Sequence, residues 1–332
     1  MADDHYSIGL WGATGALGRE VRIALEGEGL SIERLVPVVG TRTVGESVSF
    51  LGRPVDAVAA AAVDLGSLDA AIFATPSDAA EQWRQPLIDA GVLVIDASPA
   101  ADRNEGLPLV WPSLDLSALD SHPGGFGVPG GVASTAAPVL AALAKAGRIV
   151  AVDAHVLLGA GSAGREGQES LSRQTLGLLG HRVPEAGPFG AVLAFNLVAG
   201  SARAGDRRDP VDQEAASALR RLVPSLAAVE PRVSVVQVPI FTGVGVSLTV
   251  RFADPTPERP ALLAALDGAP ELLRVEGRIA ARDAVELDEV MVGDLRFDDD
   301  GAFRCFVTAD PLHRTGQAIA TLLTKVIAED LW

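Results

Sequence analysis

A glycine-rich turn between a strand and a helix is the feature that most constrains the fold of this chain. Gly12-Ala13-Thr14-Gly15-Ala16-Leu17-Gly18 follows the apolar run Tyr6–Trp11 and opens the helical segment Arg19–Leu25. Glycines here allow a tight turn and let a pyrophosphate approach the backbone N–H groups of a helix N-terminus. The strand–turn–helix context is the one that such a turn requires. We therefore predict dinucleotide binding at Gly12, Thr14, Gly15, Ala16, Leu17 and Gly18.

Further strands and helices alternate through the first part of the chain. Apolar runs at 35–39, 70–74 and 92–96 predict strands, and 78–90 has helical spacing. This alternation favours a parallel, doubly wound sheet with helices on both faces. The segment 123–131 is rich in glycine and proline, which predicts a loop or a domain boundary.

The second part of the chain has a different pattern. An alanine- and leucine-rich helix is expected at 133–146, followed by long alternating strands at 149–157, 233–240, 246–252 and 303–309. Such strands indicate an α+β domain with a mixed or antiparallel sheet. Asp298-Asp299-Asp300-Gly301 reads as a hairpin turn. The end of the chain, 316–331, has helical spacing. The expected fold class is thus α/β, with a second α+β domain.

The residues after the second predicted strand bear on cofactor choice. Sites selective for NAD usually carry an acidic residue there, which binds the ribose hydroxyls. This chain instead has Arg42 between Thr41 and Thr43. A guanidinium flanked by hydroxyls suits a 2′-phosphate, so the sequence favours NADP.

Charge and cysteine content narrow the range of partners. The formal net charge of −16 repels nucleic acid and anionic membranes, and no run of eighteen apolar residues predicts a transmembrane helix. The acidic N-terminus lacks the basic start of a signal peptide. The single cysteine, Cys305, allows no internal disulfide and fits a reducing, cytoplasmic location. We see no spacing of cysteine and histidine that predicts a metal site.

Several motifs, in order along nearly the whole chain, resemble those of the aspartate-semialdehyde dehydrogenase family. A sister family, the N-acetyl-glutamyl-phosphate reductases, shares the fold but fits the later motifs less well. The matching elements are the turn 12–18, Val94-Ile95-Asp96-Ala97-Ser98, Leu107-Pro108-Leu109-Val110, Gly159-Ala160-Gly161, Gly164-Arg165-Glu166-Gly167, Leu171-Ser172-Arg173-Gln174-Thr175, Ala194-Phe195-Asn196 and Val238-Pro239-Ile240-Phe241-Thr242-Gly243.

The resemblance implies a domain plan and a reaction. A Rossmann domain that binds NADP is expected over 1–130, completed by the C-terminal helix 314–332, and a dimerisation and substrate domain over 131–313. Thr75, in the stretch that matches a cofactor-contacting family element, is expected to touch the cofactor. A homodimer is also implied. The family reduces L-4-aspartyl phosphate to aspartate semialdehyde with NADPH, using a cysteine thiolate as nucleophile and a histidine as base.

The resemblance fails at the residues that carry this chemistry. The family cysteine corresponds to Gly131 when counted from Pro129, or to Ala133 when counted back from Ser134. The histidine position is Val244, and the arginine that binds the substrate carboxylate is replaced by Gln237. Glutamine cannot reproduce a charged bidentate pair with a carboxylate.

Other family positions are altered as well. The arginine that binds phosphate falls near Asp102 or Arg103, and the asparagine on the nicotinamide side is Pro311. His155 stands where the family has an active-site glutamine, and we expect it to be a hydrogen-bonded strand histidine. Cys305 lies in a predicted core strand, where a buried thiol is inert.

Three functions are compatible with these residues. The first is an inactive relative that forms a dimer and binds NADP(H). The second is an active NADP-dependent dehydrogenase with altered site chemistry. The third is a structural subunit that pairs with an active homologue. The missing nucleophile favours the first over the second.

Overall fold

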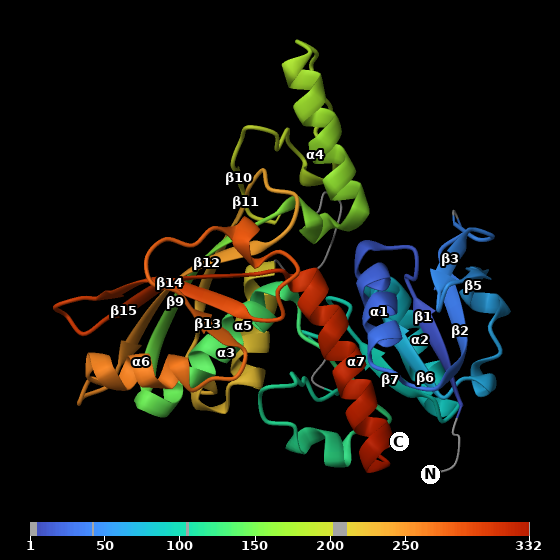
Figure 1. Cartoon of the computed structure of the whole chain (residues 1–332), viewed down its shortest axis with the longest axis horizontal. Helices are drawn as coiled ribbons and strands as arrows, with labels where there is room; N and C mark the ends of the chain where they lie inside the picture. The colour runs from blue at the N-terminus through green and yellow to red at the C-terminus, as the bar shows by residue number, and fades with distance from the viewer. Residues whose placement is uncertain (1–4, 42, 104–105, 202–210, 332) are drawn as a thin grey trace. The chain divides into compact units, whose positions relative to one another are not determined.

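The computed structural model describes residues 5–41, 43–103, 106–201 and 211–331. The chain divides into two compact units, Met1–Gly130 with Thr315–Trp332, and Gly131–Arg314. Figure 1 labels the elements of both units. Each unit is described by itself.

The first unit is built on a six-stranded sheet in which every neighbouring pair is parallel, in the order β5-β2-β1-β6-β7-β8. Its strands are β1 (Tyr6–Trp11), β2 (Ile32–Val39), β5 (Val58–Ala59), β6 (Ala70–Phe73), β7 (Leu93–Asp96) and β8 (Gly125–Gly127). A short antiparallel hairpin, β3 (Ser47–Phe50) and β4 (Arg53–Asp56), stands apart from this sheet. The predicted parallel sheet is confirmed.

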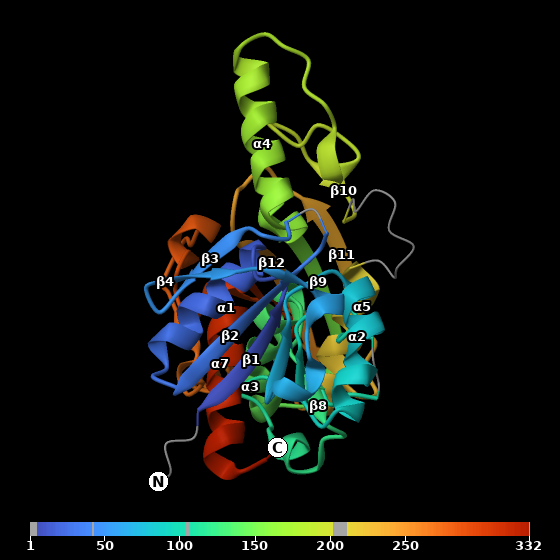
Figure 2. The ribbon, with the colours of Figure 1, turned by 90° about the vertical axis from the view of Figure 1, so that its right-hand side faces the viewer.

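Helices cover both faces of the first sheet. Right-handed crossovers that leave β1 in one direction and β6 in the other place α1 (Ala16–Gly27) and α2 (Ser77–Asp89) on opposite faces. The C-terminal helix α7 (Pro311–Glu329) lies beside α1, because a Cβ atom at Gly316 would come within 2.8 Å of the Glu20 backbone. Figure 2 shows α1 and α7 on one side of these strands and α2 on the other.

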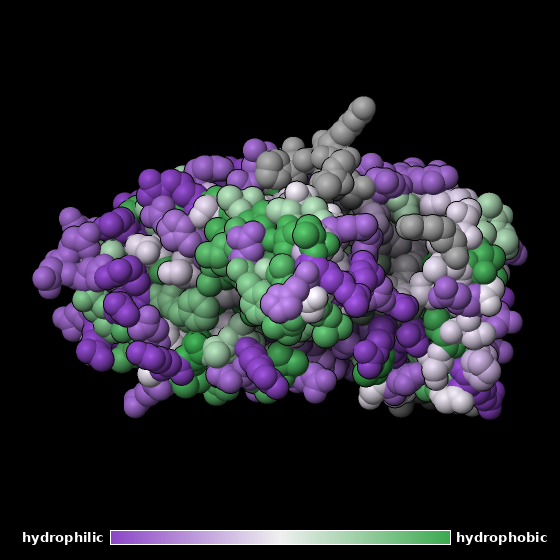
Figure 3. Space-filling view, turned by 90° about the horizontal axis from the view of Figure 1, so that it is seen from above, coloured by the Kyte–Doolittle hydropathy of each residue, from purple (hydrophilic) through white to green (hydrophobic). Residues whose placement is uncertain are grey.

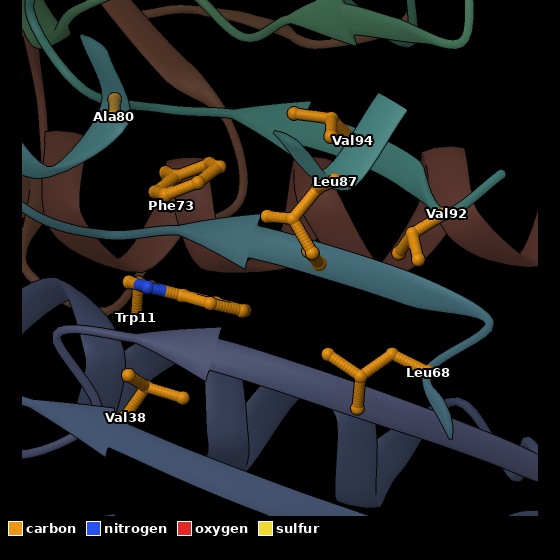
Figure 4. Packing of buried hydrophobic residues seen from close by; sticks show 9 residues of the cluster. Trp11, Val38, Leu68, Phe73, Ala80, Leu87, Val92 and Val94 are labelled. Atoms are coloured by element: carbon orange, nitrogen blue, oxygen red, sulfur yellow. The ribbon is translucent and has the colours of Figure 1, made fainter. Parts of the chain in front are cut away.

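The core under α2 is compact and apolar. Trp11 and Phe73, at the ends of neighbouring strands, pack with their ring centroids 5.3 Å apart. Ala80 and Leu87 of α2 reach the same cluster, as does Val94 of β7 (Figure 4). Burial of these side chains fixes α2 on the sheet.

The segment 123–131 contains a strand as well as a loop, which corrects the sequence-based prediction. β8 pairs with β7, and a Cβ atom at Gly125 would lie 2.4 Å from the Val94 carbonyl oxygen. Glycine is therefore needed for the close approach of these strands, and the residues that suggested a loop instead form the edge of the sheet.

The second unit is built on a seven-stranded mixed sheet, in the order β10-β11-β9-β12-β15-β14-β13. Two neighbouring pairs, β11 with β9 and β13 with β14, are parallel and the other four are antiparallel. The strands are β9 (Ile149–Leu158), β10 (Val198–Ala199), β11 (Arg232–Gln237), β12 (Val244–Phe252), β13 (Leu272–Arg274), β14 (Val290–Phe297) and β15 (Phe303–Ala309). The predicted mixed sheet and the hairpin turn after Phe297 are both confirmed.

One face of this sheet is covered within the chain. The apolar residues of β9, β12 and β15 alternate along each strand and are buried. The helices on this face are α3 (Gly131–Ala146), α5 (Val211–Leu222) and α6 (Arg259–Asp267). The open face carries more polar residues, among them the ion pair Arg232–Asp153. The buried apolar face of the sheet is therefore covered by helices of the same unit.

The helix α4 (Gly164–Leu179) and the segment that follows it, to Leu197, project from the second unit (Figures 1 and 2). We call residues 164–197 the arm. Gln174 is 2% exposed and fixes the arm internally, because its amide nitrogen donates to Glu185 and Ala186 while its oxygen accepts from Leu193 and Ala194. The arm is thus an ordered structure.

No helix in the described part of the chain has the length and apolarity needed to cross a membrane.

Candidate functional site

The candidate cofactor site of the first unit lies at the carboxyl ends of β1 and β6. The chain leaves β1 toward β2 on one side and reaches β6 on the other, so the strand order reverses between these two strands. Open α/β sheets bind ligands at such a reversal. The turn at Gly12 and the residues after β6, Ala74 and Thr75, meet here.

The glycines of the turn are required by close backbone contacts. Gly12 has a φ of +85°, and a Cβ atom on it would lie 2.2 Å from the Ala74 carbonyl oxygen. A Cβ atom at Gly18 would lie 2.2 Å from the Gly12 carbonyl oxygen. Hydrogen bonds from Gly12 to Val38 and from Gly15 to Gly12 complete the turn. Any side chain at 12 or 18 would displace the backbone that a phosphate must approach.

The start of α1 suits an anion. Its N-cap residue is Gly15, which has no side chain to hydrogen-bond the helix, and its first turn contains no acidic residue. The N–H groups of Ala16, Leu17 and Gly18 therefore form the positive end of the helix dipole. Beside this end, the Thr75 hydroxyl oxygen is buried and has no hydrogen-bond partner among the described residues. A glycine cradle, a helix end without a side-chain cap and a buried hydroxyl together fit a dinucleotide phosphate.

The predicted 2′-phosphate site is only partly described. Thr41 is exposed, and Thr43 closes the turn after β2 through a 3.1 Å hydrogen bond to the Gly40 carbonyl. Arg42 lies outside the described residues.

The stretch that matches the family's nucleophile motif contains two adjacent glycines, and α3 begins at the second of them. Gly131 is the first residue of α3, and a Cβ atom on it would lie 2.5 Å from the Cβ atom of Pro311. The ring of Pro311 is rigid, so a side chain at 131 requires a backbone shift. Ala133, the alternative position, is 1% exposed inside α3. The Thr135 hydroxyl donates to the Gly131 carbonyl at 2.7 Å.

The family's carboxylate-binding position is closed by internal hydrogen bonds. Gln237 is 2% exposed, and its amide nitrogen donates to the carbonyls of Leu158 and Gly159 at 3.1 and 3.3 Å. The hydroxyl of Ser162 donates to its carbonyl oxygen at 3.3 Å. Gln237 and Ser162 also line a small pocket with the apolar Leu158 and Phe189. The amide thus secures the turn after β9.

Val244 and Cys305 are buried in the second sheet, whereas His155 is exposed on it. Val244 is fully buried between β9 and β15. Burial raises the pKa of the Cys305 thiol to about 12, so this cysteine stays protonated at neutral pH. His155 is exposed, and its Nδ1 lies 2.7 Å from the Ser234 hydroxyl on the neighbouring strand. This matches the hydrogen-bonded strand histidine predicted from the sequence.

The residues near the family's phosphate-binding position take different roles. Asp102 is 5% exposed and accepts the Gly130 N–H with both carboxylate oxygens, at 3.1 and 3.3 Å. Arg103 points toward the start of α2, where it lies 3.5 Å from the Ser77 hydroxyl and 3.5 Å from Glu81. Within the described ranges, no group of three or more histidine, cysteine or acidic side chains is arranged to hold a metal ion.

Comparison with known protein families shows how this chain is related to them. Residues 7–122 match the NAD-binding domain of semialdehyde dehydrogenase, and residues 140–314 match the semialdehyde dehydrogenase dimerisation domain. The chain belongs to the semialdehyde dehydrogenase family. The resemblance predicted from the motifs is therefore confirmed, and so is the expectation of a nicotinamide-dinucleotide-binding domain.

Individual relatives span the same length. The aspartate-semialdehyde dehydrogenase of Corynebacterium glutamicum is 25% identical, over 95% of this chain and 97% of its own. A USG-1 protein homolog of Azotobacter vinelandii is 29% identical, over 96% and 97%. The structure of a probable aspartate-semialdehyde dehydrogenase from Pseudomonas aeruginosa superposes with a TM-score of 0.90 and 25% identity, covering 99% of this chain and all of that one.

The sequence indicates which residues differ from the family at these positions, but not how those residues pack. The family-type positions 131 and 311 are 180 residues apart, and nothing in the sequence indicated that Pro311 fills the space beside Gly131. Ser162, which closes the network around Gln237, carried no signal of its own.

Proposed function

We propose that this protein binds NADP(H) and does not catalyse the family's phosphate-dependent semialdehyde reaction. The observation that carries this proposal is the 2.5 Å separation between the Pro311 Cβ atom and any Cβ atom placed at Gly131. A thioester mechanism needs a thiolate at this loop. The loop has no thiol, and at Gly131 it also has no space for one. The remaining cysteine is buried in β15 and protonated.

Cofactor binding rests on a different part of the chain. The backbone of the turn 12–18 would hold the pyrophosphate, Thr75 would donate to or accept from the cofactor, and Arg42 with Thr41 and Thr43 would recognise the 2′-phosphate. A bound nicotinamide supplies a hydride to an acceptor. Among the described residues, we identify no nucleophile beside Gly131 that would prepare a carbonyl substrate for hydride transfer. Cofactor binding therefore does not require the residues that catalyse the semialdehyde reaction.

A steady-state assay tests the proposal. Protein purified from a host that lacks its own aspartate-semialdehyde dehydrogenase is mixed with NADP⁺, aspartate semialdehyde and phosphate, and NADPH formation is followed. We expect no turnover above the protein-free rate. Turnover of about 1 per second or faster would overturn the proposal, because that lies within the usual enzyme range.

We also propose that the protein is a homodimer, and that the arm forms part of its interface. Five apolar side chains of the arm are 67–97% exposed, whereas no other large apolar side chain in the described residues exceeds 55%. They are Leu176, Leu179, Val183, Phe195 and Leu197. Figure 3 shows apolar residues gathered over α4 and the segment after it. A contiguous apolar surface of this kind marks an interface.

Two observations favour a second copy of this chain as the occupant. The arm lies within residues 140–314, which match the family's dimerisation domain. Phe195 has a φ of +57°, an uncommon backbone conformation that holds an apolar ring in solvent. Light scattering on Leu176→Arg with Leu179→Arg should give a monomer mass where the wild type gives a dimer.

The control is Ile23→Arg, which places one arginine on an exposed apolar position of α1. A dimer in the arm variant, or a monomer in the wild type at micromolar concentration, would contradict this interface. A mixed dimer with an active homologue is the remaining alternative, and co-purification of such a homologue from the native source would favour it.

A further inference from the structure

We infer that Arg84 and Asp96 are positioning residues for cofactor binding, and that their ion pair sets the place of the nicotinamide half of NADP(H) at the ends of β6 and β7. This role rests on the proposed function, because it concerns where the second half of the bound cofactor lies. Every residue involved belongs to the first unit.

The order of the strands fixes the direction in which a bound dinucleotide extends. β2, which precedes the predicted 2′-phosphate site, lies on one side of β1, and β6 and β7 lie on the other. A cofactor with its pyrophosphate at the turn after β1 and its adenosine half over the end of β2 therefore places its nicotinamide half over the ends of β6 and β7. Adjacent strands are about 4.8 Å apart, so the end of β7 lies about 10 Å from that of β1.

The chain leaves β6 and β7 side by side at this edge of the sheet. The Ala97 N–H donates to the Phe73 carbonyl at 3.0 Å, so the segment after β7 begins beside the end of β6. The Ala74 N–H donates to the Trp11 carbonyl at 2.9 Å, which ties the end of β6 to that of β1 in the same way. Ala74, Thr75 and Ala97 are partly exposed, whereas β6 and β7 are buried throughout. These three residues therefore offer a surface to the nicotinamide and its ribose.

Asp96, the last residue of β7, holds the turn that follows this strand. Its side chain is fully buried. One carboxylate oxygen accepts the Ser98 N–H at 2.9 Å, which is a local turn of the kind that aspartate favours. The other oxygen accepts from Nε of Arg84 at 3.0 Å and from Nη2 of the same guanidinium. Ala97 lies between these two anchored residues, so its position depends on the carboxylate.

Arg84 connects the two strand ends through α2. The helix begins at Ser77, two residues after Thr75, and Arg84 follows about two turns later. The ion pair with Asp96 therefore sets the distance between the segments after β6 and after β7, which flank the nicotinamide half. Replacing a buried ion pair with apolar residues often costs no stability, so stability alone does not explain this pair. A role in setting the geometry of the cofactor site does.

Two ligands separate positioning from a purely structural role. NADPH carries both halves of the cofactor, and adenosine 2′,5′-bisphosphate carries only the adenosine half with its 2′-phosphate. Calorimetry with each ligand is run on the wild type, Arg84→Gln and Asp96→Asn, and thermal unfolding shows whether each variant is folded. Both substitutions keep a polar side chain and remove its charge. The control is Arg34→Gln, because Arg34 donates to Ser67 just before β6, at the opposite edge of the same sheet.

We expect both variants to bind NADPH about tenfold more weakly than the wild type, which corresponds to about 1.4 kcal/mol. Their affinity for adenosine 2′,5′-bisphosphate should stay within about twofold of the wild-type value, and Arg34→Gln should leave both affinities unchanged. Unchanged NADPH affinity in folded variants would overturn the positioning role, and so would equal weakening of both ligands.

A variant that does not fold is replaced by the double variant Arg84→Gln with Asp96→Asn, which leaves no unpaired charge in the pair. The same selective loss of NADPH affinity is expected from it. A double variant that also fails to fold would show that the pair serves the fold itself, and would overturn the positioning role.

The wild-type measurements separate this role from the proposed function. If the wild type binds neither ligand, the cofactor proposal itself fails. If it binds both ligands equally tightly, the cofactor proposal stands and the nicotinamide half adds no affinity. That result would refute only the role of Arg84 and Asp96.

Discussion

Gly131 packs directly against Pro311: a Cβ atom on the glycine would lie 2.5 Å from the Cβ atom of the proline. In the family to which the chain is related, one of these positions is expected to hold the nucleophile and the other an asparagine on the nicotinamide side. Both have changed here, and the two replacements fit together. We therefore expect that a thiol introduced at Gly131 alone does not fit the packing around Pro311.

Gly131→Cys should destabilise the protein and produce no dehydrogenase activity. Forcing a side chain against a rigid ring costs about 1–3 kcal/mol by overpacking. Gly27→Cys is the matched control, because a Cβ atom at Gly27 meets nothing within 4 Å. Urea unfolding of both variants gives the comparison.

Adding Pro311→Gly should recover part of that stability, because it removes the clashing Cβ atom. A double-mutant cycle is expected to give a favourable coupling of roughly 1 kcal/mol or more. Equal stability of Gly131→Cys and Gly27→Cys, or a coupling near zero, would show that the contact is not the constraint described.

Parts of the fold could be predicted from the sequence wherever a single local pattern determines the structure. The turn at Gly12, the apolar run Tyr6–Trp11 and the alternating strand β15 each follow from spacing alone. The strand β8 was not predicted, because glycine at 125 usually indicates a loop. Gly125 is needed here because the backbone of Val94 on the neighbouring strand lies so close, and the sequence does not show that contact. The helix α4 was also not predicted, since its residues were read only as a motif.

Arg314 should be more important for stability than any exposed arginine. It is 2% exposed, pairs with Glu271 at 2.5 Å and donates to the carbonyls of Ser134 and Asp288, both at 2.9 Å. Burial lowers the pKa of its guanidinium, while Glu271 raises it. Arg314→Met leaves the carboxylate and two carbonyls without this donor, which we expect to cost about 3–5 kcal/mol.

Chemical denaturation checks this, with Arg304→Met as the control. Arg304 pairs with Asp298 at the surface, where such pairs contribute about 0–1 kcal/mol. Comparable losses in the two variants would contradict the proposed clamp between α3, α7 and the segment near Glu271.

The buried thiol predicts a loss of stability at alkaline pH. The pKa of Cys305 is raised from 9.0 to about 12 by burial. Above pH 9 the unfolded chain releases this proton while the folded chain keeps it, so unfolding becomes more favourable as pH rises. The contribution falls by about 1.4 kcal/mol per pH unit between the two pKa values. Urea unfolding of Cys305→Ala should show a shallower pH dependence than the wild type in that window; parallel curves would count against it.

Arg42→Ala should weaken NADPH much more than NADH. A charged hydrogen bond to the 2′-phosphate contributes about 1.5–3 kcal/mol, or roughly 10- to 100-fold in affinity. Calorimetric titration of both cofactors measures the selectivity. Arg53→Ala, an exposed arginine in β4, controls for the loss of charge. Equal weakening of both cofactors would mean that Arg42 does not bind the phosphate.

The sequence allowed us to predict which family residues are absent from the candidate site. It did not allow us to predict the contacts made by the residues in their place. Residue identity at 131, 237 and 244 led to the prediction that the nucleophile, the carboxylate-binding arginine and the base are missing. It could not reveal that Gln237 is held by the carbonyls of Leu158 and Gly159, because those bonds depend on how two strands meet. Nor could it show Asp102 against Gly130, which requires the folded loop.

The most direct test of the central claim is a single-turnover experiment with the protein in excess over NADP⁺, in the presence of aspartate semialdehyde and phosphate. Under these conditions even slow chemistry at one site would convert the bound cofactor. We predict that the cofactor binds and that no NADPH forms beyond the rate seen without protein. Conversion of the bound NADP⁺ to NADPH, from a preparation free of any homologue, would contradict it.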